Sequence, residues 1–311
     1  MLRWTKQIYN MKRKFLLFLV FTAMMSGTSV KAQDDLLSMV NQDEKPAIDY
    51  ATATFKSTHI VIGQSIETAP KGNLNFLITH HFGALNSGYE NLFGLKQANI
   101  RLGLEYGVTR WLGVAVGLNT DKNTWDGSLK VKLLRQCKGA KHMPVTIDIF
   151  GNTAIYTTKW TDTQRPNYFS SRISYAVQVM IARKFGNSLS LQITPSMVHK
   201  NLVPTAGDKN DIFTLGGGGR VKLSQRVSIN AEYHHLFSGQ VVSVKAYDSF
   251  SLGVDIETGG HVFQIFLTNS YGEYEETYLT DTRGKWSNGD IFLGFNINRM
   301  FTIVNHKMPK E

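Results

Sequence analysis

Two pairs of adjacent histidines are the residues of this sequence that could best bind a metal ion or exchange a proton. The pairs are His80-His81 and His234-His235. Both fall in segments where apolar residues alternate with polar ones, so each pair lies on a β-strand and its two rings point to opposite faces. Neither pair can chelate one metal ion by itself. His81 and His234 could share a ligand with Glu232, but a role as polar lining is the favoured interpretation.

Hydrolysis is the second chemistry to consider. Phospholipases built as twelve-stranded barrels use a His-x-Ser pair, and barrel proteases use acidic and histidine residues at the rim. The sequence contains no His-x-Ser. Scattered loop acids more often are solvated or bind cations and surface sugars than act in catalysis. The acids of the expected loops are Asp121, Asp126, Asp208, Asp211, Asp281 and Asp290. We therefore expect no enzyme, no catalytic residue, no metal site and no cofactor.

A run of four glycines, Gly216 to Gly219, precedes Arg220. A phosphate-binding loop would need a strand before the run, a helix after it and a Lys-Ser/Thr pair. Here the run lies inside an expected strand, where glycine permits a bend or the close approach of a side chain from across a barrel. The structural interpretation is favoured.

The element that positions these residues is a β-hairpin at residues 97–119. Leu102, Leu104 and Tyr106 are apolar on one parity, and Arg101 and Glu105 are polar on the other. Alternation over about ten residues is typical of a strand that crosses an outer membrane. The same pattern recurs and predicts an all-β fold, an antiparallel up-and-down transmembrane barrel of about twelve strands. The expected strands are 73–82, 97–106, 111–119, 128–136, 145–155, 171–184, 189–198, 211–223, 227–236, 249–257, 261–269 and 290–300.

The apolar parity of these strands carries charged residues only at strand ends, as expected of a face in contact with lipid. A soluble barrel would reverse the two faces, but twelve strands enclose a lumen too wide for Leu, Val and Ile to fill. The charged parity is therefore expected to line the lumen. The candidate pore or binding residues are Arg101, Glu105, Lys130, Lys132, Asp148, Arg172, Arg220, Lys222, Glu232, His234 and Asp255. Because both signs are nearly balanced, we expect these charges to pair and to constrict the lumen.

The beginning of the chain predicts export. Lys12, Arg13 and Lys14 precede an apolar run, and Val30-Lys31-Ala32 resembles a cleavage site, so residues 1–32 are predicted to be a signal peptide rather than a membrane anchor. Either Met1 or Met11 could be the start. Six of the 34 basic residues and none of the 24 acidic residues lie before residue 33. The remaining chain therefore carries 28 basic and 24 acidic residues. This net charge of +4 is too small to indicate nucleic-acid binding.

Residues 33–71 differ from the rest because Lys56, His59 and Gln64 give them no clean lipid face. We interpret this segment as a periplasmic arm that tucks under or into the barrel of residues 72–311, with a disordered leader as the alternative. The single cysteine, Cys137, excludes an internal disulfide.

The string ITHHFGALNSGYENLFGLKQANIRLGLEYGVTRWLGVAVGLN resembles a family of Gram-negative outer-membrane β-barrels that carries a domain-of-unknown-function label. KSTHIVIGQSIET upstream and KVKLLRQ and MPVTIDIFGN downstream extend the resemblance over about residues 54–152. The resemblance implies the fold and the location, and it implies no substrate.

Taken together, these patterns predict a porin-like outer-membrane protein with both termini in the periplasm. It would act as a narrow channel, a transporter or a surface binding protein for a small polar solute. The alternatives are a non-conducting anchor for a periplasmic or surface partner and, less favoured, a hydrolase. The expected partners are outer-membrane lipid and lipopolysaccharide, the outer-membrane assembly machinery and a periplasmic partner, and no nucleic acid.

Overall fold

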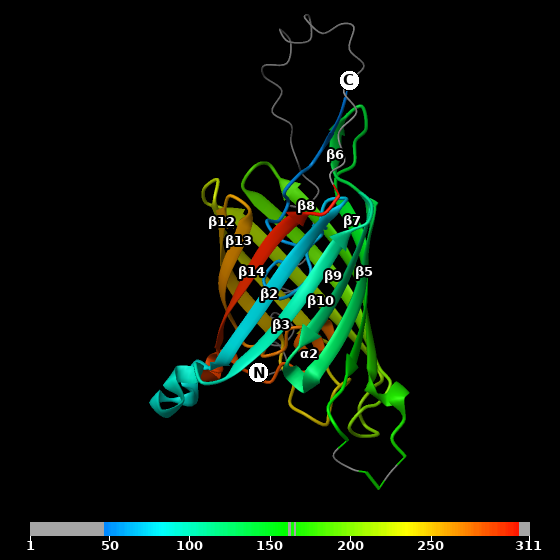
Figure 1. Cartoon of the computed structure of the whole chain (residues 1–311), viewed down its shortest axis with the longest axis vertical. Helices are drawn as coiled ribbons and strands as arrows, with labels where there is room; N and C mark the ends of the chain where they lie inside the picture. Colours follow the sequence, from blue (N-terminus) through cyan, green and yellow to red (C-terminus); the bar gives the residue numbers. More distant parts are fainter. Residues whose placement is uncertain (1–46, 161–162, 165, 305–311) are drawn as a thin grey trace, which may run out of the picture. The chain divides into compact units, whose positions relative to one another are not determined.

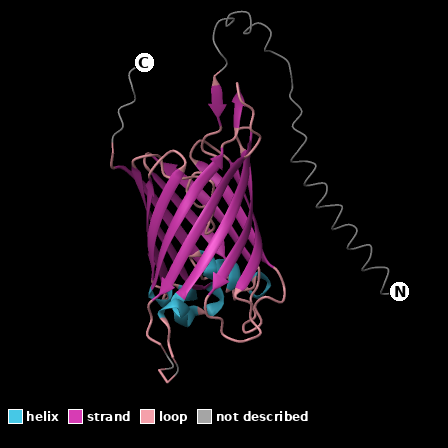
Figure 2. Ribbon diagram, turned by 90° about the vertical axis from the view of Figure 1, so that its right-hand side faces the viewer, coloured by secondary structure: helices cyan, strands magenta, loops and turns pink. Residues whose placement is uncertain are grey.

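The fold is known from a computed structural model that describes residues 47–160, 163–164 and 166–304. The predicted signal peptide and the first part of the predicted arm, residues 33–46, lie outside the described residues. Twelve of the strands in the described residues form one closed antiparallel barrel, which confirms the predicted fold (Figures 1 and 2). Each strand pairs with its neighbours along the chain, and β14 closes the barrel by pairing with β2. The barrel strands are β2 (Asn73–Ala84), β3 (Ala98–Gly107), β4 (Leu112–Asn119), β5 (Thr124–Leu134), β7 (Thr146–Tyr156), β8 (Ile173–Phe185), β9 (Leu189–Lys200), β10 (Asp211–Lys222), β11 (Val227–Leu236), β12 (Ser249–Thr258), β13 (His261–Thr268) and β14 (Phe292–Thr302).

Burial alternates along each strand as the hydrophobic pattern predicts. Val116 and Leu129 are 58% and 55% exposed on the outer surface, whereas Gln178 and Asp148 are fully buried inside. An apolar outside and a polar inside are the arrangement that lipid contact requires of a barrel. Among the described residues no helix is long and apolar enough to cross a membrane.

Strand β5 differs from its predicted range, because it begins at Thr124 and not at Ser128. The charge of Asp126 favours a loop in the sequence. In the structure this residue continues the inward parity of Ser128 and Lys130, and the guanidinium of Arg101 neutralises it inside the barrel. A paired charge can remain in a strand where an isolated one cannot.

The two ends of the barrel differ. Short turns at 108–111, 186–188, 223–226 and 259–260 lie at the end where β2 begins and β14 ends, and we call it the turn end. Here β1 (Ile48–Tyr50) pairs with β6 (Cys137–Gly139) in a separate two-stranded sheet, at the top of Figure 2. The sequence pattern predicts neither of these short strands.

Longer loops at 85–97, 157–172, 201–210, 237–248 and 269–291 lie at the opposite end, the loop end. They contain most of the short helices, drawn in cyan at the bottom of Figure 2. The helices of this end are η1 (Leu85–Ser87), η2 (Tyr89–Gly94), η3 (Asp121–Asn123), η4 (Phe169–Arg172), α2 (Glu275–Thr280) and η5 (Trp286–Asn288).

The core of the molecule lies inside the barrel. Residues 54–69, which we call the lumenal arm, are buried there almost throughout. Ile60, Val61 and Ile62 of the lumenal arm belong to one apolar cluster with Phe150 and Phe266 of the barrel wall. Burying these side chains inside the barrel removes apolar surface from water, so the lumenal arm is part of the packed core.

Candidate functional site: the plugged lumen

Glu232 on β11 anchors the lumenal arm from one side of the barrel. One carboxylate oxygen accepts hydrogen bonds from the backbone N–H groups of Ile62 (2.8 Å) and Gly63 (3.0 Å), and the other accepts from Val61 (3.1 Å). Glu232 is buried, and burying a carboxylate costs free energy unless several donors surround it. The successive backbone N–H groups of the arm form a concave anion site that supplies these donors. A side chain larger than that of glycine would clash at position 63, because a Cβ there would lie 2.9 Å from Nε2 of His234.

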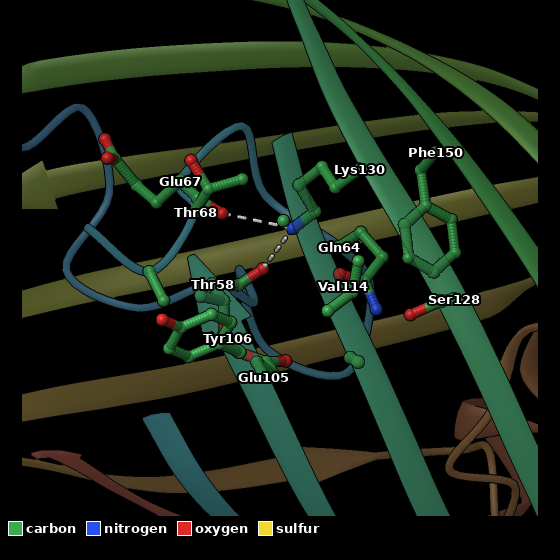
Figure 3. Close-up of a pocket in the computed structure, with 13 residues that line it drawn as sticks. Thr58, Gln64, Glu67, Thr68, Glu105, Tyr106, Val114, Ser128, Lys130 and Phe150 are labelled. Atoms are coloured by element: carbon green, nitrogen blue, oxygen red, sulfur yellow. Dashed lines mark hydrogen bonds between the residues drawn. The ribbon is translucent and has the colours of Figure 1, made fainter. Parts of the chain in front are cut away.

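Lys130 on β5 anchors the lumenal arm through the opposite charge. Its Nζ donates to the backbone carbonyls of Ser65 (2.9 Å), Glu67 (3.1 Å) and Thr58 (3.2 Å). Figure 3 shows the last two of these contacts. The ammonium group uses its three donors on carbonyl oxygens of one segment. A carboxylate of the barrel wall thus binds backbone N–H groups of the lumenal arm, and an ammonium group of the wall binds its backbone carbonyls.

The glycines of β10 make room for these contacts. A Cβ on Gly218 would lie 2.6 Å from Cδ1 of Ile60, and a Cβ on Gly216 would lie 2.6 Å from Nδ1 of His234. A Cβ on Gly217, which has the opposite parity, would meet nothing within 4 Å. Two of the four glycines therefore allow close approach inside the lumen, which is the structural role that the sequence indicates.

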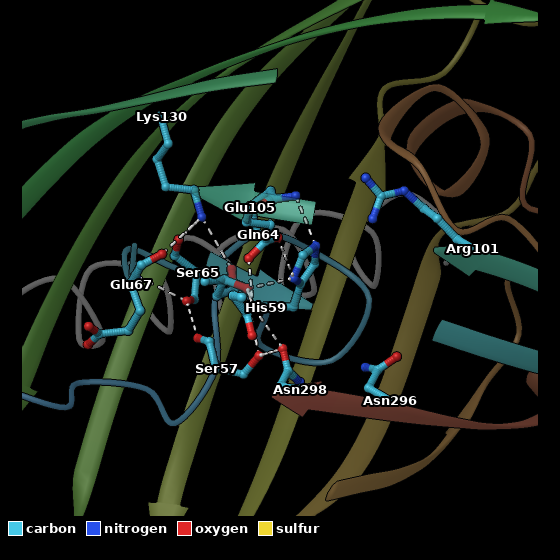
Figure 4. A network of polar contacts seen from close by, with 12 residues as sticks. Ser57, His59, Gln64, Ser65, Glu67, Arg101, Glu105, Lys130, Asn296 and Asn298 are labelled. Atoms are coloured by element: carbon cyan, nitrogen blue, oxygen red, sulfur yellow. Dashed lines mark hydrogen bonds and ion pairs between the residues drawn. The ribbon is translucent and has the colours of Figure 1, made fainter. Parts of the chain in front are cut away.

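A polar network joins the lumenal arm to β2, β3 and β14 around His59 (Figure 4). His59 Nε2 lies 3.0 Å from the side-chain amide of Gln64, and His59 Nδ1 lies 3.8 Å from Glu105. Ser57 donates to the side-chain oxygen of Asn298 at 3.0 Å. Burial lowers the pKa of His59 to about 4, so the ring is neutral near pH 7.

A second segment fills the lumen from the loop end. The loop 269–291 connects β13 to β14 at the loop end, and its helix α2 folds inward against β8, β9 and β11. Glu275 accepts a hydrogen bond from Gln64 of the lumenal arm at 3.0 Å. The ring of Tyr278 lies 5.1 Å from that of His234. Burial raises the pKa of Glu275 and of Glu273, which also lies on the inward part of this loop. The two internal segments therefore meet and close the lumen together.

The two histidine pairs each divide between the faces of the barrel wall. His81 and His234 are buried inside, whereas His80 and His235 are partly exposed. Nδ1 of His81 lies 3.2 Å from the backbone carbonyl of Tyr271, at the beginning of the inward loop. The inner rings therefore contact the segment that fills the lumen from the loop end.

Several of the predicted lumenal charges pair inside the barrel. Arg101 holds Asp126 through two hydrogen bonds, of 2.9 Å from Nε and 2.6 Å from an Nη. Lys132 lies 3.9 Å from Asp148. Charge pairing across strands is therefore present for Arg101 and Lys132, whereas Lys130 and Glu232 bind the lumenal arm instead.

The other predicted residues occupy different places. Asp255 accepts a hydrogen bond from the amide of Gln264 at 2.5 Å. Arg220 is buried and donates to the backbone carbonyl of Ala53 at 3.0 Å, so it also contacts the segment that enters the lumen. Lys222 is the last residue of β10, at the turn end, and is partly exposed.

Arg172 corrects the predicted lining. It belongs to η4 and not to β8, and its guanidinium lies 4.2 Å from the ring of Trp160. The strand begins only at Ile173, because the preceding turn of 3-10 helix already belongs to the loop. Arg172 is therefore part of the loop end and does not line the lumen.

Sequence reasoning missed the apolar residues on the inner face. Phe150, Met180, Ile212 and Phe266 point inward and belong to the same apolar cluster as residues of the lumenal arm. The available signal is the run Ile60-Val61-Ile62, because three consecutive apolar residues in an arm without a lipid face need an apolar partner elsewhere. No group of three or more His, Cys, Asp or Glu side chains within the described part of the chain could hold a metal ion.

Little space remains in the lumen. A cavity of about 30 Å³ lies beside Lys130, between the lumenal arm and the wall that includes Glu105, Tyr106 and Ser128 (Figure 3). A larger cleft of about 540 Å³ lies at the loop end, beside α2. The described state therefore offers an outer cleft and a filled lumen.

The family described as "Membrane bound beta barrel domain (DUF5777)" matches residues 55–301. No curated protein matches the sequence. Similar solved structures include the COG4313 outer membrane channel from Pseudomonas putida F1, with 11% identity, a TM-score of 0.48 and coverage of 76% of this chain and 98% of that one. The NanC porin has 9% identity, a TM-score of 0.46 and coverage of 74% and 98%. Outer membrane phospholipase A from Escherichia coli has 13% identity, a TM-score of 0.41 and coverage of 73% and 89%. At such identities the likeness concerns the fold alone.

Proposed function

Since the chain belongs to the DUF5777 family of membrane-bound β-barrel domains, as its sequence resemblance indicated, we propose that it is a gated channel for a small polar solute. It lies in the outer membrane with the loop end outside and both termini in the periplasm, because long outer loops and short periplasmic turns are the usual arrangement of such barrels. The channel is closed in the described state. Its gate is the lumenal arm, and it carries out no catalysis.

The observation that carries this proposal is the way in which the barrel holds the arm. Glu232 and Lys130 bind it through backbone N–H and C=O groups alone. Gln192 and Gln264 likewise donate to the backbone carbonyls of Gln64 and Ile60, both at 2.8 Å. When the arm leaves, these side chains line a polar lumen that water can fill. A lumen whose wall can be hydrated after the arm has left suits conduction. The hydrogen bonds between the wall and the backbone of the arm can be exchanged for hydrogen bonds to water at a modest net cost.

A non-conducting anchor is the second candidate, and one observation favours it. Several contacts fasten the exit of the arm at the turn end. Strand β1 pairs with β6, and Lys184 donates to the carbonyl of Thr52 at 2.7 Å. If these contacts never release, the barrel stays closed, and the chain before residue 48 serves to hold a periplasmic partner.

Conductance of the refolded protein in planar bilayers separates the two candidates. We expect wild type to conduct poorly and a variant lacking residues 33–71 to show steady openings. Because that deletion removes part of the core, Gly218→Val serves as a second variant that displaces the arm and keeps its sequence. Closed behaviour of both variants in a folded barrel would favour the anchor. Large openings already in wild type, unchanged by either variant, would show that the arm is no gate.

A further inference from the structure

The cleft at the loop end is built from several loops and from the inward helix α2. Tyr274, Glu276 and Thr280 line it on the side of this helix, and the neighbouring Glu275 contacts Gln64 of the lumenal arm. A solute bound here would therefore rest on the segment that closes the lumen. With a volume of about 540 Å³, the cleft lies within the usual range of small-ligand sites, so it has room for a sugar ring.

The charges of the cleft are unbalanced. Five basic and three acidic residues line it. The acids are already engaged. Asp208 accepts hydrogen bonds from the backbone N–H groups of Val242 (2.7 Å) and Ser243 (2.9 Å). Asp281 pairs with Arg283, and Glu276 lies 3.4 Å from Lys200.

Three other lysines of the cleft form no ion pair within 4 Å among the described residues, and they are Lys122, Lys159 and Lys209. They come from three different loops, and all three are exposed. A concave site with an excess of one charge concentrates ions of opposite charge. The cleft is therefore suited to an anion.

The rest of the lining shows what kind of anion fits. Trp160 and Tyr156 lie on one side, their rings 5.8 Å apart, and Arg172 holds Trp160 in place from outside the cleft lining. The lining also includes apolar side chains such as Val203 and hydroxyl groups such as that of Thr158. A free phosphate ion needs no apolar wall, and a lipid chain would not use the hydroxyl groups. A sugar ring with a carboxylate uses all three kinds of group.

We propose that the loop-end cleft binds a carboxylated saccharide, with Lys122, Lys159 and Lys209 attracting the carboxylate and the aromatic wall around Trp160 contacting the ring. This inference deepens the proposed function by naming the class of solute. Binding at the cleft does not depend on the proposed channel function, whereas transport of the bound solute through the lumen does. Because the cleft adjoins α2 at the loop end and is present while the lumen is filled, a solute can bind there before the lumenal arm moves.

Equilibrium binding to the detergent-solubilised full chain tests the proposal without any conductance measurement. The probes are D-glucuronate, D-glucose and acetate. D-glucuronate offers both a carboxylate and a sugar ring, D-glucose offers only the ring, and acetate offers only the carboxylate. We expect binding of glucuronate only, weakened by added salt. The triple variant Lys122→Gln, Lys159→Gln, Lys209→Gln should lose about tenfold or more in affinity. Lys96→Gln, at the same end but outside the cleft, is the matched control and should bind as wild type.

Each alternative result has a defined meaning. Equal affinity of wild type and the triple variant would overturn the site, as would the absence of glucuronate binding. Equal affinity for glucose would overturn the role of the carboxylate, and equal affinity for acetate would overturn the role of the ring. If glucuronate binds as expected and no variant conducts, the site stands and the channel function fails.

Discussion

Replacing Glu232 with glutamine should release the lumenal arm more often from the barrel. The carboxylate accepts hydrogen bonds from three backbone N–H groups, those of Val61, Ile62 and Gly63. In Glu232→Gln a single amide oxygen replaces two carboxylate oxygens, so one of these N–H groups loses its partner. An unsatisfied buried donor costs about 1–3 kcal/mol, and each remaining bond loses about 1 kcal/mol of charge assistance. The sum, about 3–5 kcal/mol, is an upper bound because a neutral amide is cheaper to bury than a carboxylate.

The assay is thiol labelling of a buried arm residue in native protein. Ser65 is fully buried, so Ser65→Cys in a Cys137→Ser background reports the fraction of time that the arm is released. A weakening of about 3 kcal/mol raises the labelling rate roughly a hundredfold. Asp211→Asn is the control, because Asp211 is a barrel carboxylate that pairs with His199 at the loop end and does not contact the arm. Equal labelling rates in Glu232→Gln and Asp211→Asn would refute the anchoring role of Glu232.

Four further predictions test the plug and the orientation of the barrel. Gly218→Val should weaken arm docking by about 1–3 kcal/mol through the clash with Ile60, and Gly217→Val should not; thiol labelling compares them. Docking should weaken as the pH falls from about 6.5 to 4, since the docked His59 has a pKa of about 4 against an ordinary 6.5 and binds a proton less readily than the released one. The pKa of Glu275 is raised, so its protonation stabilises the docked arm as the pH falls. His59→Gln should therefore abolish the weakening of docking in acid, and thiol labelling at a series of pH values measures this. Leu102→Arg on the outer face should lower barrel stability by about 2–4 kcal/mol near the membrane midplane, with Leu102→Met as the unaffected control in urea unfolding. An impermeant thiol reagent should reach Tyr168→Cys and not Arg110→Cys in intact cells, and the reverse would invert the proposed orientation.

The barrel was predictable because lipid imposes a strict alternation on every strand. Leu102 and Arg101 are neighbours in sequence and face lipid and lumen, and the period of two reveals both directions at once. The start of β5 was missed for the opposite reason. Asp126 is compatible with a strand only because Arg101, on β3, neutralises it across β4, and a pattern within one segment cannot show a partner from another.

The contents of the lumen were less predictable. The mixed parity of Lys56, His59 and Gln64 indicates that the arm has no lipid face, and this follows from the arm alone. The anchors could not be derived in the same way. The charge pattern predicts that Lys130 and Glu232 pair with side chains of opposite charge, whereas they bind backbone groups of the arm. Every residue offers those groups, so no residue type in the sequence marks their position.

This choice of partner matters for how the plug could move. A buried pair of opposite charges strongly resists separation, because each charge loses its only partner. Glu232 and Lys130 do not pair with one another; each binds a row of backbone dipoles on the same arm. When the arm leaves, both charges become exposed to the lumen together with the arm's own amides and carbonyls, and water can satisfy all of them.

The apolar contact of Ile60, Val61 and Ile62 with the barrel wall then supplies most of the net preference for the docked state, since water offers no substitute for it. The two charged anchors decide the register of the arm, because an arm shifted along the lumen would leave a buried charge beside mismatched backbone groups. Ile60→Ala and Glu232→Gln should therefore both raise the frequency of opening. Only Glu232→Gln should also change the position to which the arm returns, because it alone weakens the contacts that fix the register.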